Sequence, residues 1–408
     1  MNPDLFHRHD LSRRRALGLA GAAAFTTATA GLLPSAAQAA QGPEGDSSRS
    51  AAVHRGGPYT DEMFDVEAVL AGAWDRSRYG EGDQRGTFNE VTPARTAAAL
   101  RLLSGSRRVT TYTLGEEVFN GFPAFGTTPP RIYEQRLVIN GYDPGPGFDG
   151  IQGPLEPLGP NALTYMEERF EAPEGSPYTA TYQIATQLDN LNHIGVGEVY
   201  YNGFRGPDIA ETWGTNALGA QEMGPVVTRG ILLDILGLKQ AQGQTSAFFT
   251  AENGEKVLID DYRITLEDIQ AALRRQRIRG PRSGDAVIFR TGWTHLVRTD
   301  PERYVAQEPG IYLREARWLA DRRPALIGSD TWGLEVLAPA VTQGNIFPVH
   351  QELLVKNGIR IGEGVRSEDL AGDGVFEFVY VVTPQRARGA TAGNTPPAAL
   401  APAAPLFG

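Results

Sequence analysis

The order of apolar and polar positions predicts short strands with a few helices set between them. Strands are predicted at 107–114, 132–139, 285–291, 325–328 and 375–382, and helices at 92–103, 265–276, 314–321 and 352–357. The run DAVIFRT at 285–291 is apolar enough for a central strand. Thr265 and Asp268 have capping-box spacing. No linker-like composition interrupts residues 60–385, so this part is predicted to be one α/β domain.

The N-terminal residues have the composition of a targeting sequence rather than of a folded domain. The sequence SRRR at 12–15 precedes an Ala-rich stretch, and AQA at 37–39 is a small-x-small cleavage pattern. Together they predict a twin-arginine export signal and a periplasmic or extracellular location. A membrane anchor is the alternative, but Gly and Thr dilute the stretch and Pro34 ends it. The predicted divisions are an export signal at 1–39, a flexible tether at 40–57, a folded domain at 58–395 and a C-terminal tail at 396–408.

Composition removes several classes of function. The 408 residues carry a formal net charge of −10 and no Lys/Arg cluster in the body of the chain, which argues against a nucleic-acid partner. No segment after the leader is apolar enough for a membrane span. The absence of Cys excludes disulfides, thiolate zinc sites and a cysteine nucleophile. The patterns G-x-S-x-G, G-K-[ST] and H-E-x-x-H are also absent.

Polar residues concentrate around two of the four histidines that follow the leader. Gln183, Gln187, Asp189 and His193 are separated by even intervals, so an extended chain would place them on one face. A predicted helix and strand separate His350 from Glu363, and this arrangement brings both to one end of a strand–helix–strand unit. Spacing alone leaves open that His193 is a hydrogen-bonded core residue. His295 is interpreted as structural, and His54 lies in the predicted tether.

The segment QIATQLDNLNHIG at 183–195, followed by YNG at 201–203, resembles the signature of the cyclase / kynurenine formamidase-like family of metal-dependent hydrolases. Further blocks resemble the family in the same order, over about residues 71–395: RYGEGDQRGTFN at 78–89, TRGILLD at 228–234, RTGW at 290–293, GSDT at 328–331, PVHQELL at 348–354 and IGEG at 361–364. The resemblance implies a single compact, β-rich, barrel-like α/β domain of the swivelling β/β/α type. It also implies a homo-oligomer whose neighbouring subunits help to close the site.

The family pattern in the first segment is His-x-Gly-Thr-His-x-Asp-x-x-x-His. Gln183 and Gln187 stand where the family has its first two metal-binding histidines. Asp189 falls on the bridging carboxylate and His193 on the catalytic histidine. The chain therefore departs from the family pattern at both imidazoles of one metal-binding set.

The second set is retained as Asp189, His350 and Glu363, again by resemblance. With Gln187 as a weak oxygen ligand or as the holder of a metal-bound water, these residues are expected to bind one divalent ion, manganese or zinc. A dinuclear centre is not expected, because an amide oxygen is a weaker ligand for zinc than an imidazole.

The resemblance implies hydrolysis of an amide, imide or lactone bond of a small molecule by metal-bound hydroxide, with His193 as a proton shuttle. Tyr201 and Trp332 are candidates for the pocket wall, with core packing as the alternative. Two other functions stay open. One is a cyclase that acts on a secondary-metabolite intermediate, and the other is a non-catalytic small-molecule-binding protein on the same scaffold.

Overall fold

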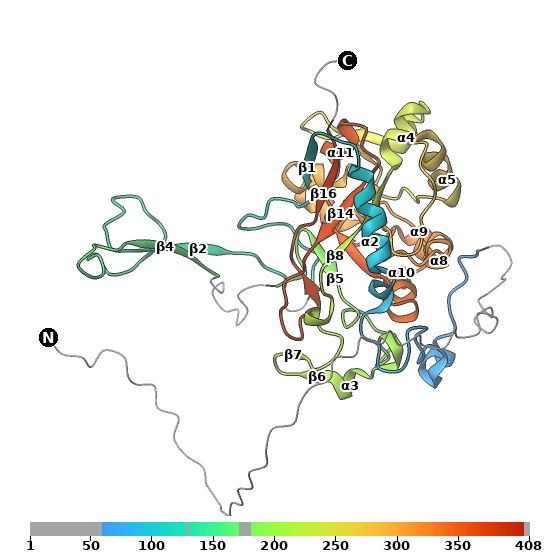
Figure 1. Ribbon diagram of the computed structural model, residues 1–408, viewed down its shortest axis with the longest axis horizontal. Helices are drawn as coiled ribbons and strands as arrows, with labels where there is room; N and C mark the ends of the chain where they lie inside the picture. Colours follow the sequence, from blue (N-terminus) through green and yellow to red (C-terminus); the bar gives the residue numbers. More distant parts are fainter. Residues whose placement is uncertain (1–58, 128–129, 171–180, 404–408) are drawn as a thin grey trace, which may run out of the picture. The chain divides into compact units, whose positions relative to one another are not determined.

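The structure is a computed structural model that describes residues 59–127, 130–170 and 181–403 (Figure 1). The predicted export signal at 1–39 and the predicted tether at 40–57 lie outside the described residues. Within the described ranges, none of the helices is both long and apolar enough to cross a membrane.

A curled sheet of nine strands, shaped like half a barrel, forms the framework (Figure 1), with the order β1-β16-β14-β8-β11-β12-β13-β5-β15. Four adjacent strands, β8, β11, β12 and β13, run parallel to one another, and the remaining neighbouring pairs are antiparallel. This arrangement confirms the predicted α/β fold class. The bounds are β1 (Val109–Thr113), β5 (Gln187–Asp189), β8 (Val226–Asp234), β11 (Ala286–Arg290), β12 (Leu326–Ser329), β13 (Arg360–Glu363), β14 (Glu377–Val382), β15 (Ala392–Gly393) and β16 (Ala398–Pro402).

Alternate residues of the parallel strands enter two different apolar layers. Leu233, Val287 and Ile327 pack in a layer that also contains residues of α5 (Leu266–Arg275) and α8 (Leu313–Ala320). Leu232 and Ile288 point to the opposite face, which α2 (Pro93–Leu100) and α11 (Glu368–Gly372) help to cover. The sheet is thus buried on both sides, as the apolar sequence of its parallel strands requires.

Local signals placed several elements correctly. In α5 both hydrogen bonds of the predicted capping box form, between the side chain of Thr265 and the backbone N–H of Asp268 and in the reverse direction. The predicted helix at 92–103 forms as α2 followed by the 3-10 helix η3 (Arg101–Leu103). The predicted helix at 352–357 forms as α10 (Pro348–His350) followed by the π-helix η8 (Gln351–Lys356).

The strand predicted at 132–139 is confirmed as β2 (Gln135–Asn140). It belongs to a separate three-stranded sheet with β3 (Ile151–Gln152) and β4 (Tyr165–Phe170). One prediction needs correction. Residues 398–402 of the predicted C-terminal tail form β16, which lies between β1 and β14 in the main sheet. This segment joins the sheet because pairing with β1 and β14 satisfies its backbone N–H and C=O groups. Its small side chains differ little in polarity, so the sequence pattern did not predict a strand there.

The remaining elements are short. They are α1 (Val66–Ala68), η1 (Val69–Ala73), η2 (Gly86–Glu90), η4 (Tyr201–Gly203), α3 (Gly206–Ile209), β6 (Ala210–Glu211), β7 (Gly214–Thr215), η5 (Ala220–Glu222), α4 (Ile235–Ala241), η6 (Thr245–Ala247), β9 (Phe248–Thr250), β10 (Lys256–Leu258), η7 (Trp293–His295), α6 (Leu296–Thr299), α7 (Pro301–Ala306) and α9 (Pro339–Thr342).

Candidate metal centre

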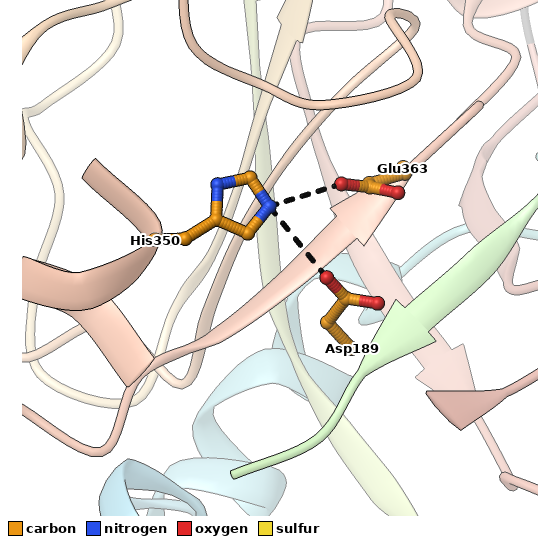
Figure 2. Close-up of side chains that lie close together, drawn as sticks. All are labelled: Asp189, His350 and Glu363. Atoms are coloured by element: carbon orange, nitrogen blue, oxygen red, sulfur yellow. Dashed lines mark hydrogen bonds and ion pairs between the residues drawn. The ribbon is translucent and has the colours of Figure 1, made fainter. Parts of the chain in front are cut away.

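Three side chains that are distant in the sequence meet at one edge of the main sheet (Figure 2). Asp189 comes from β5, Glu363 from the end of β13, and His350 from α10. The His350 Nε2 atom lies 3.2 Å from Oε1 of Glu363 and 3.6 Å from Oδ2 of Asp189. All three residues are buried, and their ligand atoms lie within 4.8 Å of one another. The structure therefore brings together the three residues expected from the sequence.

Antiparallel pairing of β5 with β13 explains why these side chains share a face. Gln187 lies opposite Glu363 in the register, and Asp189 follows Gln187 at the next position on that face. The Gln187 Nε2 group donates hydrogen bonds to Glu363 and, over 2.8 Å, to Oε1 of Gln183. Gln183 in turn donates to the Thr391 hydroxyl over 3.3 Å. Both glutamines therefore lie beside the cluster.

His193 reaches the cluster by a different route from the one expected. The prediction of extended chain from 183 to 193 is wrong, because β5 has only three residues and Ala185 adopts a left-handed φ of 55°. After β5 the chain turns, and the His193 N–H donates to the Asn190 carbonyl over 3.0 Å. This turn places His193 Nε2 at 3.7 Å from Oδ2 of Asp189. The even spacing correctly predicted that His193 lies near Asp189. The reason is the turn after β5 and not an extended chain.

The donor set fits a divalent cation. Gln187 Oε1 and Asp189 Oδ2 are buried and have no hydrogen-bond partner among the described residues. A buried polar atom without a hydrogen-bond partner is costly, and a cation bound by the cluster would satisfy Oδ2 of Asp189. One imidazole and two carboxylates form a ligand set suited to zinc or manganese. Asp189, His350 and Glu363 are therefore the residues that would hold the ion, and the amide of Gln187 lies beside them with Nε2 toward the carboxylates.

Burial and charge shift the proton equilibria of these groups. Burial raises the pKa of Asp189 to about 6, and the charge of Glu363 acts in the same direction. Burial by itself would lower the pKa of His350, but hydrogen bonds to Glu335 and Glu363 outweigh it and raise this pKa to about 10. Burial lowers the pKa of His193, although the charge of Asp189 opposes that effect. At neutral pH the metal-free site thus has a protonated His350 and a neutral His193.

We expect metal affinity to increase with pH, because an ion must displace the proton of His350. The pKa of Asp189 is about 6 and that of His350 is about 10. Between these two pH values the association constant for the metal should rise roughly tenfold per pH unit. Below pH 6, Asp189 must also lose its proton, and the rise should be steeper. Calorimetric titration with Zn²⁺ at several pH values, in buffers of different ionisation enthalpy, measures the affinity and the protons released. An affinity that is constant between pH 7 and pH 9 would contradict the assignment of His350 as a ligand.

Aromatic side chains form one wall next to the cluster. A cavity of about 20 Å³ is bordered by Gln187, Glu363 and Trp332, and Trp332 stacks on Phe125 with ring centres 4.6 Å apart. This volume is sufficient for one water molecule. Trp332 therefore borders this cavity and also packs in a buried apolar cluster, so it combines the two alternatives of pocket wall and core packing. Tyr201 is not among the described residues that line this cavity. Its hydroxyl instead donates a hydrogen bond to Oδ2 of Asp83 over 2.7 Å.

Sequence reasoning missed Glu335, a fully buried residue whose carboxylate contacts His350. Glu335 lies in the segment GLEVL, which carries no metal or catalytic motif, so no local signal marks it. His295 lies outside the cluster, with Nε2 at 3.9 Å from Glu368.

Comparison with known proteins identifies the family. A family model described as "Cyclase: Putative cyclase" matches residues 112–336, more than half of the chain. The chain belongs to the cyclase family. It is 26% identical to a crystal structure described as a novel cyclase, with a TM-score of 0.62, over 83% of this chain and 99% of the other. Asp189 lies inside the matched range, whereas His350 and Glu363 lie beyond it.

More distant structures are similar to this chain as well. Isatin hydrolase A from Ralstonia solanacearum is 16% identical, with a TM-score of 0.49, over 75% of this chain and 96% of the other. Isatin hydrolase A from Labrenzia aggregata is 17% identical, with a TM-score of 0.48, over 76% and 100%. No curated protein sequence matches this chain.

Proposed function

We propose that this cyclase-family protein is a metal-dependent hydrolase that cleaves an amide, imide or lactone bond of a small molecule. The observation that carries the proposal is the buried cluster of Asp189, His350 and Glu363, with an unpartnered Asp189 oxygen facing His193. Such a cluster next to a neutral imidazole combines a cation site with a proton acceptor. Metal-assisted hydrolysis of a carbonyl compound uses both.

Asp189, His350 and Glu363 would hold the ion, and the Gln187 amide, whose Nε2 donates to Glu363, would support that carboxylate. A bound manganese or zinc ion supplies Lewis acidity and lowers the pKa of a water molecule. The cavity beside Gln187 and Glu363 has the volume of one water, which is a suitable place for the nucleophile. Trp332 and Phe125 shield that position on one side.

His193 is suited to move the proton. Burial keeps its pKa low, so at neutral pH the imidazole accepts a proton from the attacking water. The charge of Asp189, 3.7 Å from Nε2, stabilises the imidazolium that results. The side chain is only partly exposed, which keeps this proton from exchanging freely with bulk solvent before it passes to the leaving group.

The test is turnover by the metal-loaded protein on a panel of small amides, imides and lactones. We expect His193→Ala to lower kcat by about 10²- to 10⁴-fold, with metal content unchanged, because its imidazole acts on protons. Turnover that survives in this variant would contradict the proton-shuttle role. A metal-loaded protein that turns over no member of the panel would instead favour the cyclase or the non-catalytic binding protein.

We also propose that the chain is exported by the twin-arginine route to the periplasm or beyond, and that it acts as a homo-oligomer. The SRRR and AQA patterns support the first statement, and family membership supports the second. Fractionation of the producing cell and light scattering of the purified protein test them.

A further inference from the structure

The ring of His350 is held on more than one side. Its Nε2 atom faces Glu363 and Asp189 (Figure 2). Its other ring nitrogen, Nδ1, lies 2.7 Å from Oε1 of Glu335. The Phe347 ring lies edge-on to the imidazole, with ring centres 4.9 Å apart. These contacts leave the imidazole little freedom to rotate or flip.

Glu335 itself is fixed by backbone groups. The N–H of Val349 donates to its Oε2 over 3.0 Å, and the N–H of His350 donates to its Oε1 over 3.0 Å. The side chain is fully buried. The carboxylate therefore binds the first turn of α10 and the ring of His350 at once, which ties the orientation of the ring to that of the helix.

Backbone strain marks both segments that form this contact. Leu334, directly before Glu335, has a φ of 63°, and Phe347, directly before α10, has a φ of 52°. Non-glycine residues in this region are strained and persist where the surroundings impose them. The backbone is thus held in an unusual conformation directly before each of the two segments that form this contact.

We propose that Glu335 is a positioning residue, which fixes the ring and the tautomer of His350 so that Nε2 faces the metal position. An imidazole binds a metal through the nitrogen that carries no proton. A carboxylate that accepts the proton of Nδ1 therefore leaves Nε2 as the ligand. This inference rests on the proposed metal-dependent function and adds a residue outside the ligand set.

The test is Glu335→Gln, with Zn²⁺ or Mn²⁺ alone as the probe. We expect the dissociation constant to rise about 10- to 100-fold, which is the effect of removing other residues that orient metal ligands. The matched control is Glu352→Gln, since Glu352 is also buried, lies on the helix that follows α10, and pairs with Lys356 and Arg317 without contacting His350. Its dissociation constant should stay within about twofold of wild type.

A purely structural role would give a different result. If both variants lose similar stability and both bind the metal as wild type does, the positioning role is wrong and the proposed function stands. If wild type binds no metal, the proposed function itself fails. If Glu335→Gln does not fold, ¹⁵N-histidine spectra of zinc-loaded wild type decide the question. A protonated Nδ1 on His350 supports the proposal, and zinc bound through Nδ1 overturns it.

Discussion

Replacing His350 with alanine is expected to lower metal affinity by more than about 100-fold, beyond the range of residues that only orient ligands, and to abolish the proposed hydrolysis. His350 supplies the nitrogen ligand of the cluster. Its removal also deprives three buried carboxylates, those of Asp189, Glu363 and Glu335, of the His350 ring. Because the charge of His350 lowers the pKa of Asp189, its loss raises that pKa, and a proton then competes with the ion.

Metal content by elemental mass spectrometry, and titration of the metal-free variant, measure the change. His295→Ala is a suitable control, because His295 is also largely buried and faces a carboxylate, yet lies outside the cluster. That variant should keep the metal content of wild type. A His350→Ala protein that is folded and retains its full metal content would show that the ion, if there is one, binds elsewhere.

The largest effect on stability is expected for Arg360→Leu. Arg360 is fully buried and donates to Oδ1 of Asn190 over 2.9 Å and to the Arg85 carbonyl over 2.7 Å. Its guanidinium also lies 4.3 Å from the ring centre of Phe88. Leucine would fill part of the volume but leave Oδ1 of Asn190 buried without a donor, at about 1 to 3 kcal/mol. The Arg85 carbonyl would keep the N–H of Phe88 as a donor over 3.2 Å.

We therefore expect the free energy of unfolding to fall by about 2 to 4 kcal/mol, from the unpaired Asn190 oxygen and the lost cation–π contact with Phe88. Urea denaturation of the purified protein gives the difference. Arg322→Ala is the matched control, because its guanidinium stacks on Trp318 at the edge of the core, where such a contact contributes about 1 kcal/mol or less. Equal urea midpoints for wild type and Arg360→Leu would contradict the prediction.

Sequence reasoning worked where one segment carries the whole signal. The apolar run at 285–291 became β11 in the middle of the sheet, and the capping box at Thr265 formed in α5. It failed at β16, where the sequence AALAP offers small side chains of similar polarity. Buried and less buried positions do alternate along that strand, but their side chains have similar polarity. The sequence therefore shows no alternation of apolar and polar residues there.

The same limit applies to the candidate site. Asp189, His350 and Glu363 were grouped by their residue types and by the family resemblance, and the structure places them together. Glu335 was not, because its contact with His350 depends on how the chain between them folds. The metal, the reaction and the role of His193 stay predictions that the experiments above address.

The position of β5 in the sheet has a consequence for the time at which the site forms. The strand that carries Asp189 is paired with β13 on one side and with β15 (Ala392–Gly393) on the other. A ribosome makes both partners of β5 long after it has made Asp189 itself. A growing chain therefore cannot enclose the cluster during most of its synthesis. We expect the ion to be acquired only after translation is almost complete, and a chain that stops before residue 390 to emerge without a working site.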